Sequence, residues 1–291
     1  MAKSIRLFKS IIRLVLPALF LVVAALVSGS VWLVYTSARP FKAPYLVTPE
    51  RYGQLSSRAA QVTEESWPNR DGSSSRGWLL RGADGAPAVI LYHKYGADRS
   101  YVLNLGVKIN ESRNFTVLMP DLRRHGEKPS VDNASSGGCE DEDAGLALEF
   151  LRGLRTPNQI TLVGKNIGIY GVEVGASVAL MTAARDESVK ALALDSVPED
   201  ADSVLRETVV RRFPFASSAT TRLANLGTRL YYFDGCYQRE PACETARKVA
   251  NRDLLLLAGV DASDFQDSTS RLSKCFPATN RIRTKLDLSP S

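Results

Sequence analysis

A turn framed by two glycines constrains the fold of this 291-residue chain more than any other feature. Residues 166–170 form an apolar run typical of a buried strand, and residues 176–184 have the composition of a helix. Between them lies the sequence Gly-Val-Glu-Val-Gly, with Glu173 at its centre. Glycines two residues away on each side allow a strained turn that raises the central side chain above a parallel sheet. The sequence therefore predicts a strand, a tight turn and a helix, with Glu173 at the apex.

Apolar runs alternate with helical patterns along most of the chain. Such alternation implies right-handed crossovers, so we expect an α/β fold with a doubly wound, mostly parallel sheet. A helix over 140–154 should bury Ala144, Ala147, Leu148 and Leu151, and the spacing of Val102, Leu105 and Ile109 predicts another. A mostly helical insert is expected at about 197–250. The remaining expected strands lie at 77–81, 88–93, 115–119, 189–194, 253–259 and 281–288.

The N-terminal region has the pattern of a membrane anchor. Residues 14–35 are 22 positions without a charge, which is enough to cross a hydrocarbon core of ~30 Å as a helix. Residues 1–13 carry four cations and no acid, so they should stay in the cytoplasm and place the rest of the chain outside. A cleaved signal peptide is the alternative, but this apolar stretch is longer than is usual for one and no clear cleavage site follows.

Charge and composition limit the partners. Residues 1–13 supply +4 of the net charge of +6, and the rest of the chain, with 33 basic and 31 acidic residues, is nearly neutral. We therefore exclude nucleic acid as a partner, since no concentrated basic face accompanies this balance. Residues 36–60 are mixed in polarity and hold several prolines, so we expect a tether that needs no fixed structure, followed by one domain over 61–291. We expect no cofactor.

Four cysteines lie on the side expected to be exported, where thiols tend to form disulfides. Cys236 and Cys243 flank a short polar stretch and are expected to pair, which leaves Cys139 and Cys275 as a long-range pair. A zinc site is the weaker interpretation, because the cysteines have neither close spacing nor a nearby histidine.

These elements, taken together over residues 70–288, resemble the α/β-hydrolase superfamily, especially its membrane-anchored or secreted serine esterases and prolyl-oligopeptidase-like hydrolases. Residues 93–96, His-Lys-Tyr-Gly, resemble the family's His-Gly-x-Gly loop, and residues 121–126 resemble its D-x-R-G-H-G motif. Residues 171–175 match the frame of its G-x-S-x-G nucleophile elbow. A shortened G-x-x-D at 259–261 puts Asp261 near the place of the triad acid. The resemblance implies an oxyanion hole formed by the backbone N–H groups of Tyr95 and Val174, with Lys94 beside it.

The chain departs from this family in its chemistry. Serine hydrolysis needs a nucleophile, a histidine base and an acid, but Glu173 has no hydroxyl and no histidine follows the last expected strand. The chain has only His93 and His125, and both occupy motif positions where a structural role is usual. The leading hypothesis is therefore a protein of hydrolase fold without serine-hydrolase activity, which binds a small molecule or a protein.

Two other functions remain open on the sequence. Glu173 and Asp261 form a pair of carboxylates that would hydrolyse an ester or a related bond, if their pKa values were sufficiently different. A displaced nucleophile, Ser177 or Ser196, ranks last, because Ser177 lies on the helix after the turn rather than at its apex.

Overall fold

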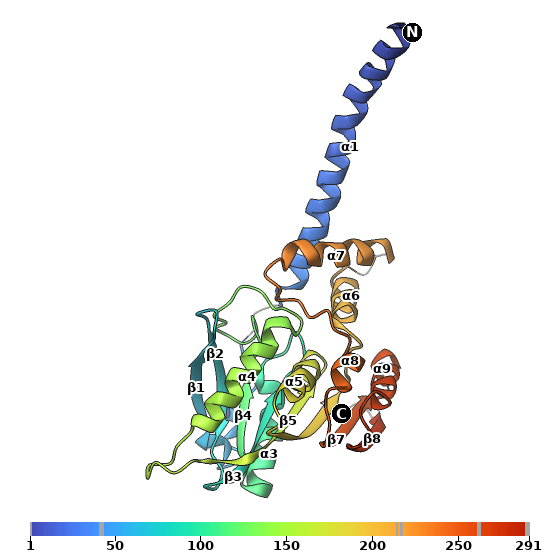
Figure 1. Ribbon diagram of the computed structural model, residues 1–291. Coiled ribbons are helices and arrows are strands. Elements are labelled where there is room, and N and C mark those ends of the chain that lie inside the picture. Colours follow the sequence, from blue (N-terminus) through green and yellow to red (C-terminus); the bar gives the residue numbers. More distant parts are fainter. Residues whose placement is uncertain (1, 41–43, 214, 216–217, 261–262, 289–291) are drawn as a thin grey trace. The chain divides into compact units, whose positions relative to one another are not determined.

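The computed structural model describes residues 2–40, 44–213, 215, 218–260 and 263–288, without the side chains of residues 2–12, 14 and 60. The chain divides into two compact units. Unit 1 consists of Met1–Ser37 and Leu205–Asp234, and unit 2 consists of Ala38–Val204 and Gly235–Ser291. Each unit is described by itself, and unit 2 contains the sheet (Figure 1).

The sheet of unit 2 has eight strands in the order β1-β2-β4-β3-β5-β6-β7-β8. Strand β2 is antiparallel to both of its neighbours, and the other pairings are parallel. The expected doubly wound, mostly parallel sheet is thereby confirmed. The strands are β1 (Thr63–Pro68), β2 (Ser74–Leu80), β3 (Ala86–Tyr92), β4 (Thr116–Pro120), β5 (Val163–Val172), β6 (Val189–Asp195), β7 (Asp253–Gly259) and β8 (Arg281–Leu288).

Two hydrophobic clusters form on the sheet, and successive residues of a strand alternate between them. On β3, Ile90 belongs to the larger cluster, which includes residues of α4 (Gly138–Gly153) and α5 (Val174–Arg185). The next residue, Leu91, belongs to the cluster formed with α3 (Leu103–Arg113). This alternation is the period of two expected for a strand that is buried on both faces. The apolar face predicted for 140–154 is confirmed, because Ala144, Ala147, Leu148 and Leu151 are all buried.

The helix after β3 is present, and of its three predicted apolar positions Val102 is buried and Ile109 partly buried, but Leu105 is not on the buried face. A short 3-10 turn, η2 (Arg99–Val102), leads into α3, whose buried positions are Leu103, Gly106, Val107 and Asn110, whereas Leu105 is exposed. A Cβ at Gly106 would lie 2.6 Å from the sulfur of Met119 on β4. The helix therefore turns its glycine toward the sheet, where a larger side chain would not fit.

The segment expected to be a tether contains ordered structure and contacts the domain. It holds α2 (Pro49–Tyr52) and the 3-10 turn η1 (Ala59–Gln61). The hydroxyl of Tyr45 donates to Asp121 Oδ2 at 2.9 Å, and the Tyr45 ring lies 5.0 Å from that of Trp78. Strand β1, which was not predicted, follows at once. Its side chains are mostly exposed, so it lacks the apolar run that marks the central strands.

The expected disulfide between Cys236 and Cys243 is wrong. The structure pairs Cys139 with Cys236 and Cys243 with Cys275, with Cα–Cα distances of 4.9 and 5.3 Å. A Cβ at Gly138 would overlap the Cys236 carbonyl, so the start of α4 packs directly against the chain at Cys236. Cys243 lies on α8 (Ala242–Ala246), which packs against α9 (Ser263–Ser273), and Cys275 follows α9.

Unit 1 is helical. Helix α1 (Ala2–Ser37) includes an apolar segment, Val15–Ser37, that is long enough to span a membrane, with a mean hydropathy of 2.2. Helices α6 (Ala201–Arg212) and α7 (Ser218–Tyr231) come from the chain between β6 and β7, as does α8 in unit 2. A small cluster of buried side chains joins α1, α6 and α7, among them Leu33, Val209 and Ala224.

Candidate functional site at the carboxyl edge of the sheet

Glu173 occupies the turn between β5 and α5. Its backbone angles are φ 52° and ψ −115°, a left-handed conformation that costs a non-glycine residue about 1–3 kcal/mol. The flanking glycines allow the chain to close around this turn. A Cβ at Gly171 would overlap the Gly175 carbonyl, and a Cβ at Gly175 would lie 2.6 Å from the His93 carbonyl oxygen. The structure thus places Glu173 at the start of α5, where the sequence predicted it.

A second carboxylate, which the sequence analysis missed, lies at the same edge. Asp195 ends β6, and its carbonyl accepts the Glu173 N–H at 2.9 Å. The Tyr170 hydroxyl donates to Asp195 Oδ2 at 3.3 Å, and the Ser196 hydroxyl donates to Oδ1 at 2.9 Å. Since parallel strands present their carboxyl ends at one edge, the position of Asp195 at the end of the adjacent strand was the signal that could have identified it.

The hydroxyl of Tyr101 interacts electrostatically with both Glu173 and Asp195. Burial, and then the charges of Asp195 and Glu173, raise the pKa of its hydroxyl above the ordinary value. The Lys94 ammonium lies 5.3 Å from the centroid of the Tyr101 ring, so it approaches the same edge. The structure thus brings together two carboxylates, a phenol and a lysine, a set able to hydrogen-bond a polar ligand.

The residues implied as oxyanion-hole donors lie on the two segments that meet here. Val174 is buried at the first position of α5, and the Tyr95 ring packs edge-on against that of His125, with centroids 5.2 Å apart. Their role as donors to a ligand stays a prediction. Asp261, the other expected carboxylate, lies outside the described residues.

Both histidines have structural hydrogen bonds. His93 is fully buried; its Nδ1 donates to the Lys94 carbonyl at 2.8 Å, and its Nε2 accepts the Leu122 N–H at 3.1 Å. His125 donates from Nδ1 to the Arg123 carbonyl at 2.7 Å and accepts the Gly96 N–H at 3.0 Å. Burial lowers the pKa of His93 to about 4 and that of His125 to about 3. Each imidazole is therefore neutral, with both nitrogens engaged by the backbone.

This arrangement predicts how the histidines titrate. Both rings should remain neutral and protonated at Nδ1 from pH ~8 down to pH ~5, because the folded state resists protonation that a free imidazole undergoes near pH 6.5. Long-range ¹H–¹⁵N NMR of the two rings, assigned with His125→Gln, checks both the tautomer and the pKa. A ring that titrates near pH 6.5 would contradict the structural role.

The same pKa shifts predict that the folded state becomes less stable as the pH falls. Unfolded histidines take up protons below pH ~6.5 while the folded ones do not, so acidification favours the unfolded state. For His93 alone, the loss in unfolding free energy between pH ~6.5 and ~4 is roughly 3 kcal/mol.

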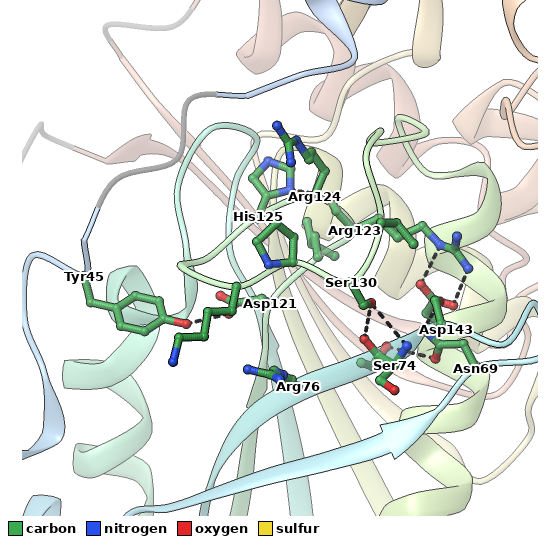
Figure 2. Close-up of a pocket in the computed structure, with 16 residues that line it drawn as sticks. Tyr45, Asn69, Ser74, Arg76, Asp121, Arg123, Arg124, His125, Ser130 and Asp143 are labelled. Atoms are coloured by element: carbon green, nitrogen blue, oxygen red, sulfur yellow. Dashed lines mark hydrogen bonds and ion pairs between the residues drawn. The ribbon is translucent and has the colours of Figure 1, made fainter.

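A separate surface pocket lies beside the start of β2 (Figure 2). It is lined by residues of the β1–β2 turn and of the loop after β4, together with Tyr45 and Asp143, and it includes neither Glu173 nor Asp195. Arg123 is one of the lining residues, and its guanidinium group forms ion pairs with Asp71 at 2.7 Å and with Asp143 at 2.6 Å. Burial raises the pKa of the Asp143 carboxyl to about 6, although Arg123 opposes the shift. These contacts join the turn, the loop and α4, which is a structural role.

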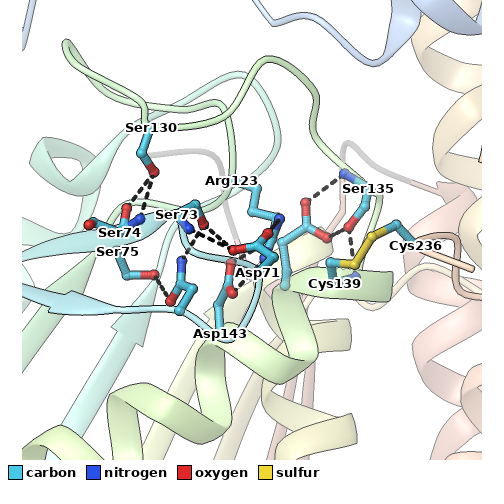
Figure 3. A network of polar contacts seen from close by, with 12 residues as sticks. Asp71, Ser73, Ser74, Ser75, Arg123, Ser130, Ser135, Cys139, Asp143 and Cys236 are labelled. Atoms are coloured by element: carbon cyan, nitrogen blue, oxygen red, sulfur yellow. Dashed lines mark hydrogen bonds and ion pairs between the residues drawn. A yellow bond between two sulfur atoms is a disulfide. The ribbon is translucent and has the colours of Figure 1, made fainter. Parts of the chain in front are cut away.

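The polar contacts continue to the start of α4 (Figure 3). The carboxylate of Glu140 accepts the Ser135 N–H at 2.7 Å and the Gly137 N–H at 3.0 Å. The Ser135 hydroxyl accepts the Cys139 N–H at 2.9 Å and also donates to Glu140. These bonds satisfy N–H groups at and just before the helix terminus, and the Cys139–Cys236 disulfide lies beside them. Glu140 therefore fixes the N-terminus of this helix.

Comparison with solved structures identifies the fold. An esterase of Pyrococcus furiosus, Pf2001, is 17% identical with a TM-score of 0.59, over 86% of this chain and 90% of its own. The α/β-hydrolase GrgF of a Penicillium species is 13% identical with a TM-score of 0.58, over 78% of this chain and 90% of its own. Acetyl xylan esterase 1 of a Thermoanaerobacterium species is 14% identical with a TM-score of 0.53, over 79% and 78%. No protein-family model matches the sequence, and no curated protein matches it.

Proposed function

We propose that this chain, which has the α/β-hydrolase fold, is a membrane-anchored extracytoplasmic protein that lacks serine-hydrolase activity and binds a small molecule or a protein at the carboxyl edge of its sheet. The observation that carries the proposal is the identity of the groups at that edge. Glu173 stands at the turn where hydrolases of this fold present a nucleophile. The chain's two histidines are buried, neutral and bonded to the backbone, so neither supplies a base.

The anchor rests on the N-terminal helix. The segment Val15–Ser37 is 23 residues long, about 34 Å at 1.5 Å per residue, and its flank carries four cations. Cations on this side support a cytoplasmic N-terminus and an extracytoplasmic sheet. The two disulfides in unit 2 agree with an extracytoplasmic location, since disulfides rarely persist in the reducing cytoplasm.

The second candidate function is carboxylate catalysis. Glu173 would act as nucleophile or base, together with Asp261 as the sequence suggests. The structure adds a specific observation in its favour, since Asp195 and Glu173 both raise the pKa of Tyr101 and so lie within electrostatic reach of one phenol. Two carboxylates near a phenol can share acid and base roles if their pKa values are separated.

Hydrolysis of short-chain aryl esters distinguishes the two functions. We expect the purified protein to hydrolyse them no faster than Glu173→Gln, because an unactivated site has no base to deprotonate water. A rate that falls at least about tenfold in Glu173→Gln and again in Asp195→Asn or Asp261→Asn, but not in Ser177→Ala, would establish carboxylate catalysis instead.

A further inference from the structure

Helix α7 carries an apolar stripe on its exposed side. Leu226 is 62% exposed and Leu230 is 53% exposed, and Phe233, just beyond the helix, is 88% exposed. The spacing of four residues puts Leu226 and Leu230 on one face of α7, and Phe233 follows directly after the helix. Arg222 lies four residues before Leu226 and Arg229 lies three residues after it, so two arginines border the stripe. Apolar residues flanked by arginines on one helix face are typical of helices that lie in a membrane interface.

The opposite side of α7 packs on α1. The residues of α1 that it contacts determine the position of α7 along the α1 axis. A Cβ at Gly227 would overlap the Ser30 carbonyl and would lie 3.1 Å from a methyl group of Val34. The ring of Tyr231 lies 6.4 Å from that of Tyr35. Contact between the two helices therefore falls in the last turns of the apolar segment Val15–Ser37.

The thickness of a bilayer then determines the depth of α7 in the membrane. The part of the apolar segment before Ser30 is 15 residues, about 22 Å long, which is shorter than a hydrocarbon core of ~30 Å. A spanning α1 must therefore place the level of Ser30 and Val34 inside the outer leaflet. Whatever packs on those residues lies at the same depth. Within unit 1, α7 crosses the end of α1 rather than running alongside it (Figure 1), as expected for a helix lying in the plane of the interface.

Charge agrees with this position. The segment Leu205–Asp234 contains five arginines and two acidic residues, so it carries a net positive charge. Arginine side chains can extend from an apolar stripe toward lipid headgroups while their methylene groups remain among acyl chains. Trp32 on α1, 53% exposed and 5.5 Å from the Phe213 ring, is of a type enriched at membrane interfaces.

We propose that α7 is embedded in the outer leaflet of the membrane that α1 spans, with Leu226, Leu230 and Phe233 among the upper acyl chains and Arg222 and Arg229 at anionic headgroups. This inference rests on the proposed membrane anchor. The chain then has a second membrane contact, supplied by the insert between β6 and β7 in addition to the N-terminal helix. An interfacial helix of this kind is buried about 5–10 Å into the boundary between headgroups and acyl chains.

Quenching of tryptophan fluorescence by brominated lipids tests the proposal. The full chain is reconstituted into vesicles containing anionic lipid, with bromine atoms near the top of the acyl chains. Trp67 and Trp78 are buried in unit 2, so the part of the wild-type fluorescence that is lost in Trp32→Phe reports the anchor, and the fluorescence added by Leu226→Trp reports α7. The matched control is Glu149→Trp, at an exposed position of α4 in unit 2. Leu226 is largely exposed, so its replacement leaves the packing of unit 1 intact.

We expect Trp32 to be quenched, and the fluorescence added by Leu226→Trp to fall by about half or more, while that added by Glu149→Trp is unaffected. Quenching of Trp32 without quenching at position 226 would overturn the interfacial helix but leave the anchor. The absence of quenching at both positions would overturn both. Equal quenching at positions 226 and 149 would mean nonspecific adsorption and would also overturn the proposal.

Discussion

Replacing Cys139 and Cys236 together with serine lowers the free energy of unfolding by about 5 kcal/mol, because the disulfide closes a loop across 97 residues and restricts the unfolded chain. Typical domains have a total stability of about 5–15 kcal/mol, so this loss is a third or more of the total. Urea unfolding of the full chain in detergent, followed by circular dichroism, measures the change.

The second disulfide provides the matched control. Replacing Cys243 and Cys275 with serine opens a loop of 32 residues, for which the expected loss is about 4 kcal/mol. Non-reducing peptide mapping of the wild-type protein should recover both of these pairs. Recovery of a peptide that joins Cys236 to Cys243, or unchanged stability in either double variant, would contradict the assigned pairing.

Gly175→Ala is expected to cost at least about 3 kcal/mol of unfolding free energy or to prevent folding. A methyl group there would lie 2.6 Å from the His93 carbonyl and 2.7 Å from that of Tyr92, and backbone atoms at the end of a central strand cannot move aside. Thermal unfolding of the purified variant measures the loss.

Gly145→Ala is the control for this substitution. Gly145 is inside α4 with nothing within 4 Å of the added methyl group, so the change should stabilise the helix by roughly 0.5–1 kcal/mol. A Gly175→Ala protein as stable as Gly145→Ala would show that the turn at Glu173 is not packed as the structure indicates.

The sequence predicted those parts of the fold that local patterns specify. Seven of the eight strands in the sheet were predicted, six of them from apolar runs, and the glycines around Glu173 located its turn because a Cβ at Gly171 or Gly175 would overlap neighbouring backbone. Strand β1 was missed because it is a polar strand at the edge of the sheet. Its hydrogen bonds to β2, rather than an apolar sequence, hold it in the sheet. Leu105 was placed on the wrong face because Gly106, rather than the apolar spacing, determines how α3 meets Met119.

Long-range contacts explain the other differences. Cysteines close in sequence were expected to pair, but the path of the insert takes Cys236 to the start of α4 and Cys243 to α9. At the site, Glu173 was predicted from its local motif, whereas Asp195 becomes a neighbour only through the pairing of β5 with β6. The roles of both histidines followed from their motifs, and their backbone hydrogen bonds supply the physical reason.

Labelling by a fluorophosphonate probe tests the central claim most directly, because the probe reacts with a serine only when a base activates it. The full chain is treated beside an active serine esterase and beside Glu173→Ser. We predict no labelling of the wild-type protein and none above background for Glu173→Ser, since both histidines are held by the backbone and neither can accept the serine proton. Stoichiometric labelling of the wild-type chain at any serine would contradict the account.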